Sequence, residues 1–143
     1  MPTRWIATMT AIPILLTAAC APATNAARAA PPSDARPLAE PGAQDQRLDD
    51  VTRELRDALE TRHGRLDIEA YEVPTRMTWP EVAGHYQTEL GDWDVEPALP
   101  EQIRAARARA WKRQDALLAI ALIDTPVAGE QRDYKVLVVA KKR

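Results

Sequence analysis

Two apolar runs near the C-terminus constrain the fold of this chain more than any other feature. Every residue from Leu117 to Ile123 is apolar, and the second run is apolar from Val136 to Ala140. Each run has the length of a strand and is rich in branched aliphatic side chains. The segment between them contains Gly129 and several polar residues, which suits a hairpin loop. The runs predict an antiparallel hairpin in the centre of a sheet, because both faces of each strand are apolar.

Two earlier stretches have the periodicity of amphipathic helices. In residues 49–63, apolar side chains recur at steps of three and four, and Gly64 can adopt the left-handed conformation that ends a helix. The second stretch begins with Thr78-Trp79-Pro80-Glu81, which has the pattern of a capping box, and Gly91 follows it. Its apolar face consists of Trp79, Val82, Ala83, Tyr86 and Leu90. The sequence predicts helices over both stretches.

The remaining segments complete a mixed fold. Residues 65–73 alternate between apolar and polar side chains before Pro74, which predicts a half-buried strand. Residues 101–113 fit both a helix and a strand. We expect a short helix from about Pro100 that passes into a strand at 108–112, paired with 117–123. The sequence thus predicts an α+β fold, a two-layer sandwich in which two main helices pack on one face of an antiparallel sheet of about four strands.

The N-terminus has the zones of an export signal. Arg4 supplies a positive charge, a largely apolar stretch runs from Trp5 to Thr17, and no acidic residue occurs before Asp34. This stretch is shorter than the roughly twenty residues of a membrane-spanning helix, and Pro13 would kink it. Residues 1–19 are therefore predicted to be a signal peptide and not a transmembrane anchor.

The apolar stretch ends in Leu16-Thr17-Ala18-Ala19-Cys20, and Cys20 is the only cysteine of the chain. This run resembles the lipobox of bacterial lipoproteins, and the resemblance covers residues 1–20 alone. It implies that Cys20 becomes the mature N-terminus and carries a covalent diacylglycerol and an acyl chain. Ala21, where a retained protein would have aspartate, implies the outer membrane. The alternative is an ordinary signal peptide and secretion to the periplasm.

The mature chain divides into a linker and one domain. Residues 20–45 are rich in alanine and proline, and Leu38 is their one large apolar side chain. Such a composition cannot repay the entropy of folding, so it predicts a disordered tether. Residues 46–143 have the size of a single α+β domain. Deletion of residues 22–45 is expected to leave the thermal unfolding of that domain nearly unchanged.

The residue types of common catalytic and metal sites are scarce. Ser33 is the only serine and falls in the linker, so the Gly-x-Ser-x-Gly nucleophile motif is excluded. The five glycines do not form a phosphate-binding loop. His63 and His85 are the only histidines, and we expect both to have structural roles on helices. We therefore expect that the protein is not an enzyme and that it binds no metal and no cofactor apart from the lipid on Cys20.

Charge is unevenly distributed within the domain. Residues 81–101 contain six acidic residues and no lysine or arginine. Basic residues follow at once, namely Arg104, Arg107, Arg109, Lys112 and Arg113. We expect these adjacent segments to neutralise each other across the fold. The alternative is a docking face for a protein partner, for which the candidate contact residues are Trp93, Arg107, Arg109 and Trp111.

The features above favour a lipid-anchored, periplasm-facing envelope lipoprotein whose domain is a non-catalytic binding or adaptor module. Its partners would be the membrane, through the anchor, and a protein or another envelope component. Without the signal peptide the chain has 18 basic and 21 acidic residues, which does not favour nucleic acid. The alternative function is a small ligand-binding domain or enzyme, with a pocket between helices and sheet near Tyr86, Trp93 and Tyr134.

Overall fold

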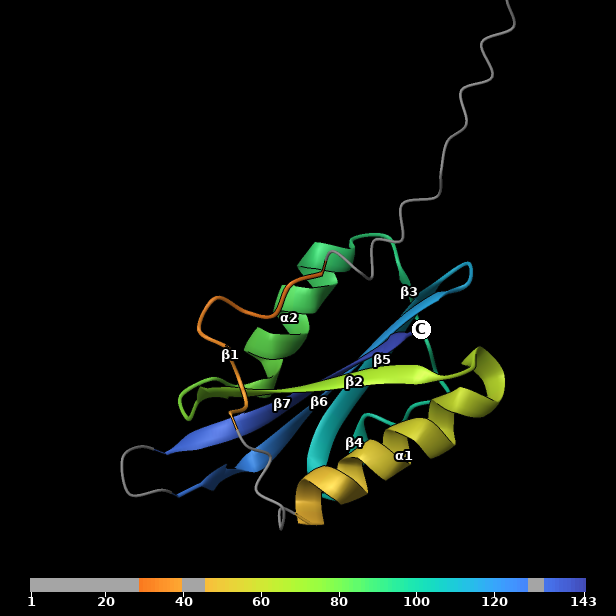
Figure 1. Cartoon of the computed structure of the whole chain (residues 1–143). Helices are drawn as coiled ribbons and strands as arrows, with labels where there is room; N and C mark the ends of the chain where they lie inside the picture. Colours follow the sequence, from red (N-terminus) through yellow and green to blue (C-terminus); the bar gives the residue numbers. More distant parts are fainter. Residues whose placement is uncertain (1–28, 40–45, 129–132) are drawn as a thin grey trace, which may run out of the picture.

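The computed structural model describes residues 29–39, 46–128 and 133–143, which form an α+β domain around one antiparallel sheet (Figure 1). The helices are α1 (Gln46–His63) and α2 (Trp79–Leu90). Four strands are long: β2 (Leu66–Pro74), β5 (Ala106–Arg113), β6 (Ala116–Val127) and β7 (Tyr134–Lys142). Three strands of two residues lie at the sheet edges: β1 (Arg36–Pro37), β3 (Asp94–Val95) and β4 (Gln102–Ile103). The described sheet thus has seven strands, of which the sequence predicted the four long ones.

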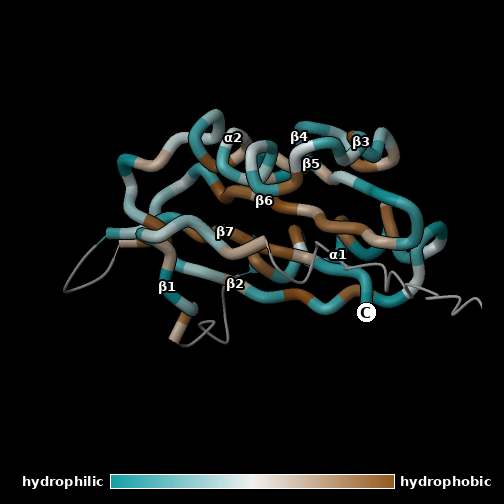
Figure 2. The backbone as a smooth tube through the Cα atoms, turned by 90° about the horizontal axis from the view of Figure 1, so that it is seen from above, coloured by the Kyte–Doolittle hydropathy of each residue, from teal (hydrophilic) through white to brown (hydrophobic). Residues whose placement is uncertain are grey.

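The predicted hairpin of apolar strands is confirmed and lies in the middle of the sheet. The strand order is β1-β2-β7-β6-β5-β3, and β4 also pairs with β5. Strands β5, β6 and β7 form a meander, and β2 pairs with the far side of β7. Figure 2 shows hydrophobic residues concentrated in the interior, along β6 and its neighbours. Every residue of the two apolar runs is buried, because both strands have neighbouring strands on each side and packed side chains on each face.

The two helices lie on opposite faces of the sheet, so the prediction that both pack on one face is wrong. Leu117, Ala119 and the other odd-numbered residues of the β6 run belong to a core that also contains the buried face of α1. Leu118 and the other even-numbered residues belong to a second core, which contains the buried face of α2. We call these the α1-side core and the α2-side core. A strand that is apolar on both faces requires cover on both, because successive side chains point to opposite sides.

The helix ends follow the local sequence. Gly64 ends α1 with a φ of 85°, a conformation that glycine adopts without steric cost, and its N–H donates to the carbonyl of Glu60 at 2.9 Å. At the start of α2, the Glu81 carboxylate accepts from the backbone N–H of Thr78 at 2.7 Å and from its hydroxyl at 2.9 Å. Both predicted helices are confirmed, and α1 begins three residues earlier than expected.

Residues 101–113 differ in part from the prediction. No helix forms there, and β4 and β5 form a tight reversal in which Gln102 pairs with Arg107 and Ile103 with Ala106. The predicted pairing with the apolar run is confirmed, because Arg113 pairs with Ala116 across a turn in which Gln114 has a φ of 52°. The helical spacing of Ile103, Ala106 and Ala110 was misleading. All three side chains pack in the α1-side core from two separate strands.

Candidate functional site

Residues 1–28, which include Cys20, lie outside the part of the chain that the structure describes. The lipid anchor therefore stays a prediction from the sequence. The described chain begins at Ala29, nine residues beyond Cys20. In the described part of the chain, no helix is long and apolar enough to cross a membrane.

The two tryptophans that were candidates for partner contact lie in the α2-side core. Trp93 is 4% exposed and Trp111 is fully buried. The indole N–H of Trp111 donates to the side-chain oxygen of Gln87 at 2.9 Å, and its ring stacks against Tyr86 with centroids 6.4 Å apart. Both tryptophans are thus unavailable to a partner in this structure. No local pattern distinguishes them from surface tryptophans, because their burial depends on α2 crossing over β5.

Arg107 and Arg109, the other two candidates, are half-buried on β5 and point to the same side of the sheet as Trp111. Arg109 forms an ion pair with Glu101. The Nε atom of Arg107 is buried and has no hydrogen-bond partner among the described residues. The structure therefore brings the four candidates to one side of the sheet, but only the two arginines reach its surface.

The acidic and basic segments do neutralise each other across the fold. Arg113 pairs with Asp92 at 3.1 Å, Lys112 with Glu96 at 3.2 Å, and Arg109 with Glu101. Arg104 pairs instead with α1, at 3.2 Å from Glu54 and 3.9 Å from Asp50. The expected neutralisation is confirmed for Arg109, Lys112 and Arg113, and Arg104 is neutralised by α1 instead.

Glu96 is the one charged side chain that is buried in the described structure, with 2% of its surface exposed. Its Oε2 atom lies 2.9 Å from Nε2 of His63 and 3.2 Å from Nζ of Lys112. Its Oε1 atom accepts from the N–H of Ala98 at 3.0 Å. We refer to Glu96, His63 and Lys112 as the Glu96 cluster. It connects the last turn of α1, the segment after β3, and strand β5.

Burial by itself raises the pKa of Glu96, but the Ala98 N–H, Lys112 and His63 outweigh it and lower the pKa below the usual value. The ionised carboxylate can therefore fix the end of α1 to the sheet. A carboxylate that holds a histidine also orients the general base of many hydrolases. Residues 46–143, however, contain neither serine nor cysteine to serve as the nucleophile. Sequence reasoning missed this cluster because its members are brought together only by the fold.

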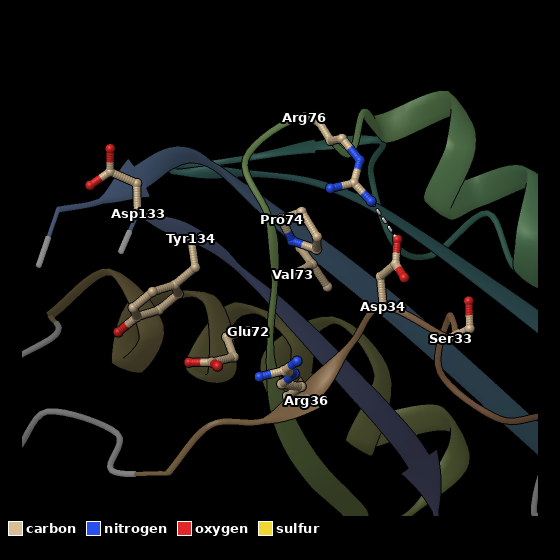
Figure 3. A pocket seen from close by; sticks show the side chains of 9 residues that line it. All are labelled: Ser33, Asp34, Arg36, Glu72, Val73, Pro74, Arg76, Asp133 and Tyr134. Carbon is tan, nitrogen blue, oxygen red and sulfur yellow. Dashed lines mark hydrogen bonds and ion pairs between the residues drawn. The ribbon is translucent and has the colours of Figure 1, made fainter. Parts of the chain in front are cut away.

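An open pocket of about 370 Å³ lies where residues 33–36 pass the ends of β2 and β7 (Figure 3). Arg76 and Asp34 form an ion pair at 2.8 Å on one side of it. Arg36, Glu72 and Tyr134 lie on another side. This is not the pocket expected between helices and sheet. Tyr86 and Trp93 lie in the α2-side core, whereas Tyr134 packs against the α1-side core.

Residues 29–39, which the sequence assigned to a disordered tether, are packed on the domain; we call this segment the clasp. Figure 1 shows it running beside α2 and then beside β2. The ring of His85 lies with Nε2 2.8 Å from the carbonyl oxygen of Ala30. Residues Arg36 and Pro37 pair with β2, and the N–H of Leu38 donates to the carbonyl of Ala70 at 3.0 Å. Over this stretch the structure differs from the predicted disorder.

The clasp contacts both cores. Ala29 is 3% exposed and belongs to the α2-side core, whereas Leu38 packs against the α1-side core. The segment therefore crosses the outer edge of β2 from one face of the sheet to the other. Main-chain groups of an edge strand are otherwise free to pair with another chain. The clasp covers part of this edge with backbone hydrogen bonds.

Among the described residues, no group of three or more histidine, cysteine or acidic side chains is placed to hold a metal ion. Val95 is the one large hydrophobic side chain in the described structure that is exposed, with 53% of its surface accessible.

In the comparisons with known proteins, no family model, curated protein or solved structure matches this chain.

Proposed function

We propose that this protein is a bacterial envelope lipoprotein, anchored through Cys20 at the periplasmic face of the outer membrane, whose domain is a non-catalytic binding module. The observation that carries the proposal is the N-terminal sequence, in which an apolar stretch with Arg4 at its start leads into Ala18-Ala19-Cys20. A thiol is required there, because thioether formation to a diacylglycerol needs a soft nucleophile.

The anchor would act by restricting the domain to a thin layer next to the bilayer. Each buried methylene contributes about 0.8 kcal/mol, so one acyl chain binds weakly and two or three bind stably. Confinement raises the effective concentration of the domain toward neighbouring envelope components. Of the predicted contact residues, Arg107 and Arg109 remain candidates for a partner surface, because they are partly exposed whereas Trp93 and Trp111 are buried.

Labelling with a fatty acid tests the anchor directly. Cells that express the full chain are grown with a clickable palmitate analogue, and the purified protein is analysed by intact-mass spectrometry. We expect a mass that corresponds to a chain beginning at Cys20 with added glyceride and acyl groups. The Cys20→Ser variant should take up no label and keep residues 1–19.

A matched control moves the thiol to another position. The double variant Cys20→Ser/Ser33→Cys keeps a single cysteine, at a residue whose side chain is exposed. It should also remain unlabelled, because the signal depends on the residues before Cys20 and not on a thiol alone. A free thiol at Cys20 in the native protein would overturn the proposal.

The pocket of Figure 3 favours a second candidate function, the binding of a small polar ligand. Its volume lies at the lower end of the range of ligand pockets, and its lining includes both signs of charge. Arg36 would recognise an acidic group of the ligand, because a guanidinium binds carboxylate or phosphate through two parallel hydrogen bonds.

Titration with N-acetylmuramic acid and with glycerol 3-phosphate, followed by amide chemical shifts, tests this second function. Binding at the pocket would shift the signals of residues 33–36 and of Tyr134. These shifts should disappear in Arg36→Gln and persist in the control Arg53→Gln, which alters an exposed arginine of α1. Shifts that survive in Arg36→Gln, or no shifts at all, would exclude this site for both ligands.

A further inference from the structure

The place at which the chain enters the domain determines which side of the domain lies nearest the anchor. Ala29 is buried in the α2-side core, and His85 of α2 contacts the carbonyl of Ala30. The described chain therefore starts beside α2, on the face of the sheet opposite α1 (Figure 1). Any restraint applied through Cys20 acts on the domain at this point.

The length of chain between the anchor and this point is short. Ala29 is nine residues beyond Cys20, and nine fully extended residues span at most about 30 Å. If the linker reached to the start of α1 at Gln46, the limit would be about 90 Å. A domain of this size is roughly 35 Å across. The clasp thus reduces the reach of the anchor from well over the width of the domain to less than that width.

We propose that the clasp orients the domain, so that its α2 side faces the lipid bilayer that holds Cys20 and its α1 side faces away. This inference rests on the proposed lipid anchor. The occupant of the α2 side is the bilayer surface itself, and the restraint is the length of the chain. This orientation would also turn Arg107 and Arg109 of β5 toward the bilayer, so a partner that contacts them would have to bind at the membrane surface, and the α1 side would be open to the periplasm.

The orientation does not depend on charge attraction to lipid. On the α2 side of the sheet, Arg109 and Arg113 of β5 are already paired with Glu101 and Asp92. The exposed residues of α2 include Glu81 and Glu89, and the helix contains no lysine or arginine. A helix with this composition is not attracted to an anionic membrane surface. The orientation is therefore expected to be the same at low and at high salt.

Energy transfer to labelled lipid measures the orientation. Acylation uses the only native cysteine, so an introduced cysteine is the single reactive thiol of the mature protein. The acylated full chain is placed in vesicles with acceptor-labelled headgroups, and a donor is attached at Thr88→Cys on α2 or at Asp57→Cys on α1, both exposed positions. We expect at least roughly twofold more efficient transfer from Thr88→Cys, because the two sides are separated by the width of the domain.

Two insertions of the same length separate the clasp from other causes. A Gly-Ser segment of about 20 residues placed between residues 28 and 29 lengthens the chain before the clasp and should equalise the two efficiencies. The same segment placed between residues 42 and 43 lies after the clasp and should leave the difference unchanged.

Each outcome supports or overturns a defined claim. Equal transfer from both donors in an acylated, vesicle-bound protein overturns the orientation and leaves the anchor standing. Loss of the difference with the insertion at 42–43 shows that the clasp does not carry the restraint, and loss of the difference at high salt shows attraction to lipid. A chain that is not acylated and does not bind vesicles overturns both proposals.

Discussion

Nε2 of His85 lies 2.8 Å from the carbonyl oxygen of Ala30, which joins the middle of α2 to the clasp. The neighbouring Ala29 is 3% exposed in the α2-side core. These two contacts place the start of the described chain beside α2, although the composition of the segment predicted disorder. A short ordered clasp is stable because the domain supplies a buried site for Ala29 and a strand edge for residues 36–38.

Ala29→Glu should release the clasp. A charged side chain cannot occupy the buried site of Ala29, so the segment would detach and the Leu38 amide would lose its partner, the carbonyl of Ala70. Hydrogen exchange at the Leu38 amide should become faster by at least about tenfold, since the lost contacts are worth more than about 1.4 kcal/mol. Ala30→Glu is the matched control, because its side chain is exposed. Unchanged exchange in Ala29→Glu would contradict the role of the clasp.

Glu96→Gln should destabilise the domain by about 1–3 kcal/mol at neutral pH, because Lys112 and His63 lose a charged acceptor. The pKa of Glu96 is lowered in the folded state, so the folded protein binds fewer protons there than the unfolded chain. The contribution is complete above the pKa of an unfolded glutamate, near 4.3, and disappears as the pH falls through the lower folded value.

Urea unfolding of Glu96→Gln and of the native protein between pH 7 and pH 3 checks this. The difference in stability should shrink below about pH 4, where the glutamate of the unfolded chain becomes protonated. Asp94→Asn provides a control with the same change in net charge, at an exposed position on β3. It should have little effect at any pH. A difference between native and Glu96→Gln that stays constant over this range would exclude the ionised carboxylate as its source.

Trp111→Ala should lower the free energy of unfolding by about 3–5 kcal/mol, because the fully buried ring leaves a cavity in the α2-side core. A tryptophan that served as a surface anchor would instead weaken partner binding with little loss of stability. Chemical unfolding distinguishes the two roles. Val95→Ala alters an exposed apolar residue and should change stability by less than about 0.5 kcal/mol.

Gln114→Gly should stabilise the protein by up to about 1 kcal/mol, because glutamine adopts a φ of 52° at a steric cost that glycine avoids. The expected readout is a higher midpoint of thermal unfolding. Asp115→Gly in the same turn is the control and should not stabilise, because Asp115 is not among the described residues with a positive φ. Equal effects of the two substitutions would contradict a strained position at Gln114.

Elements defined by local pattern could be predicted from the sequence. The run Leu117–Ile123 is apolar at every position, and this identified a central strand before its partners were known. The same pattern also requires cover on both faces of the sheet, a consequence that the two-layer prediction overlooked. Which face of the sheet each helix covers depends on the path of the chain from β2 through α2 to β5. No local sequence pattern near α2 indicates that face.

The sequence by itself determined both helices and the hairpin of apolar strands, because each depends on neighbours within a few residues. The export signal before Cys20 is likewise a prediction from local sequence. Only the tertiary structure decided that Trp111 is core, that Glu96 is a buried ion and that residues 29–39 form the clasp. These properties depend on contacts between segments far apart in the chain. His63 and Glu96, for example, are 33 residues apart, and their side chains meet because α1 packs on the sheet and β3 pairs with β5.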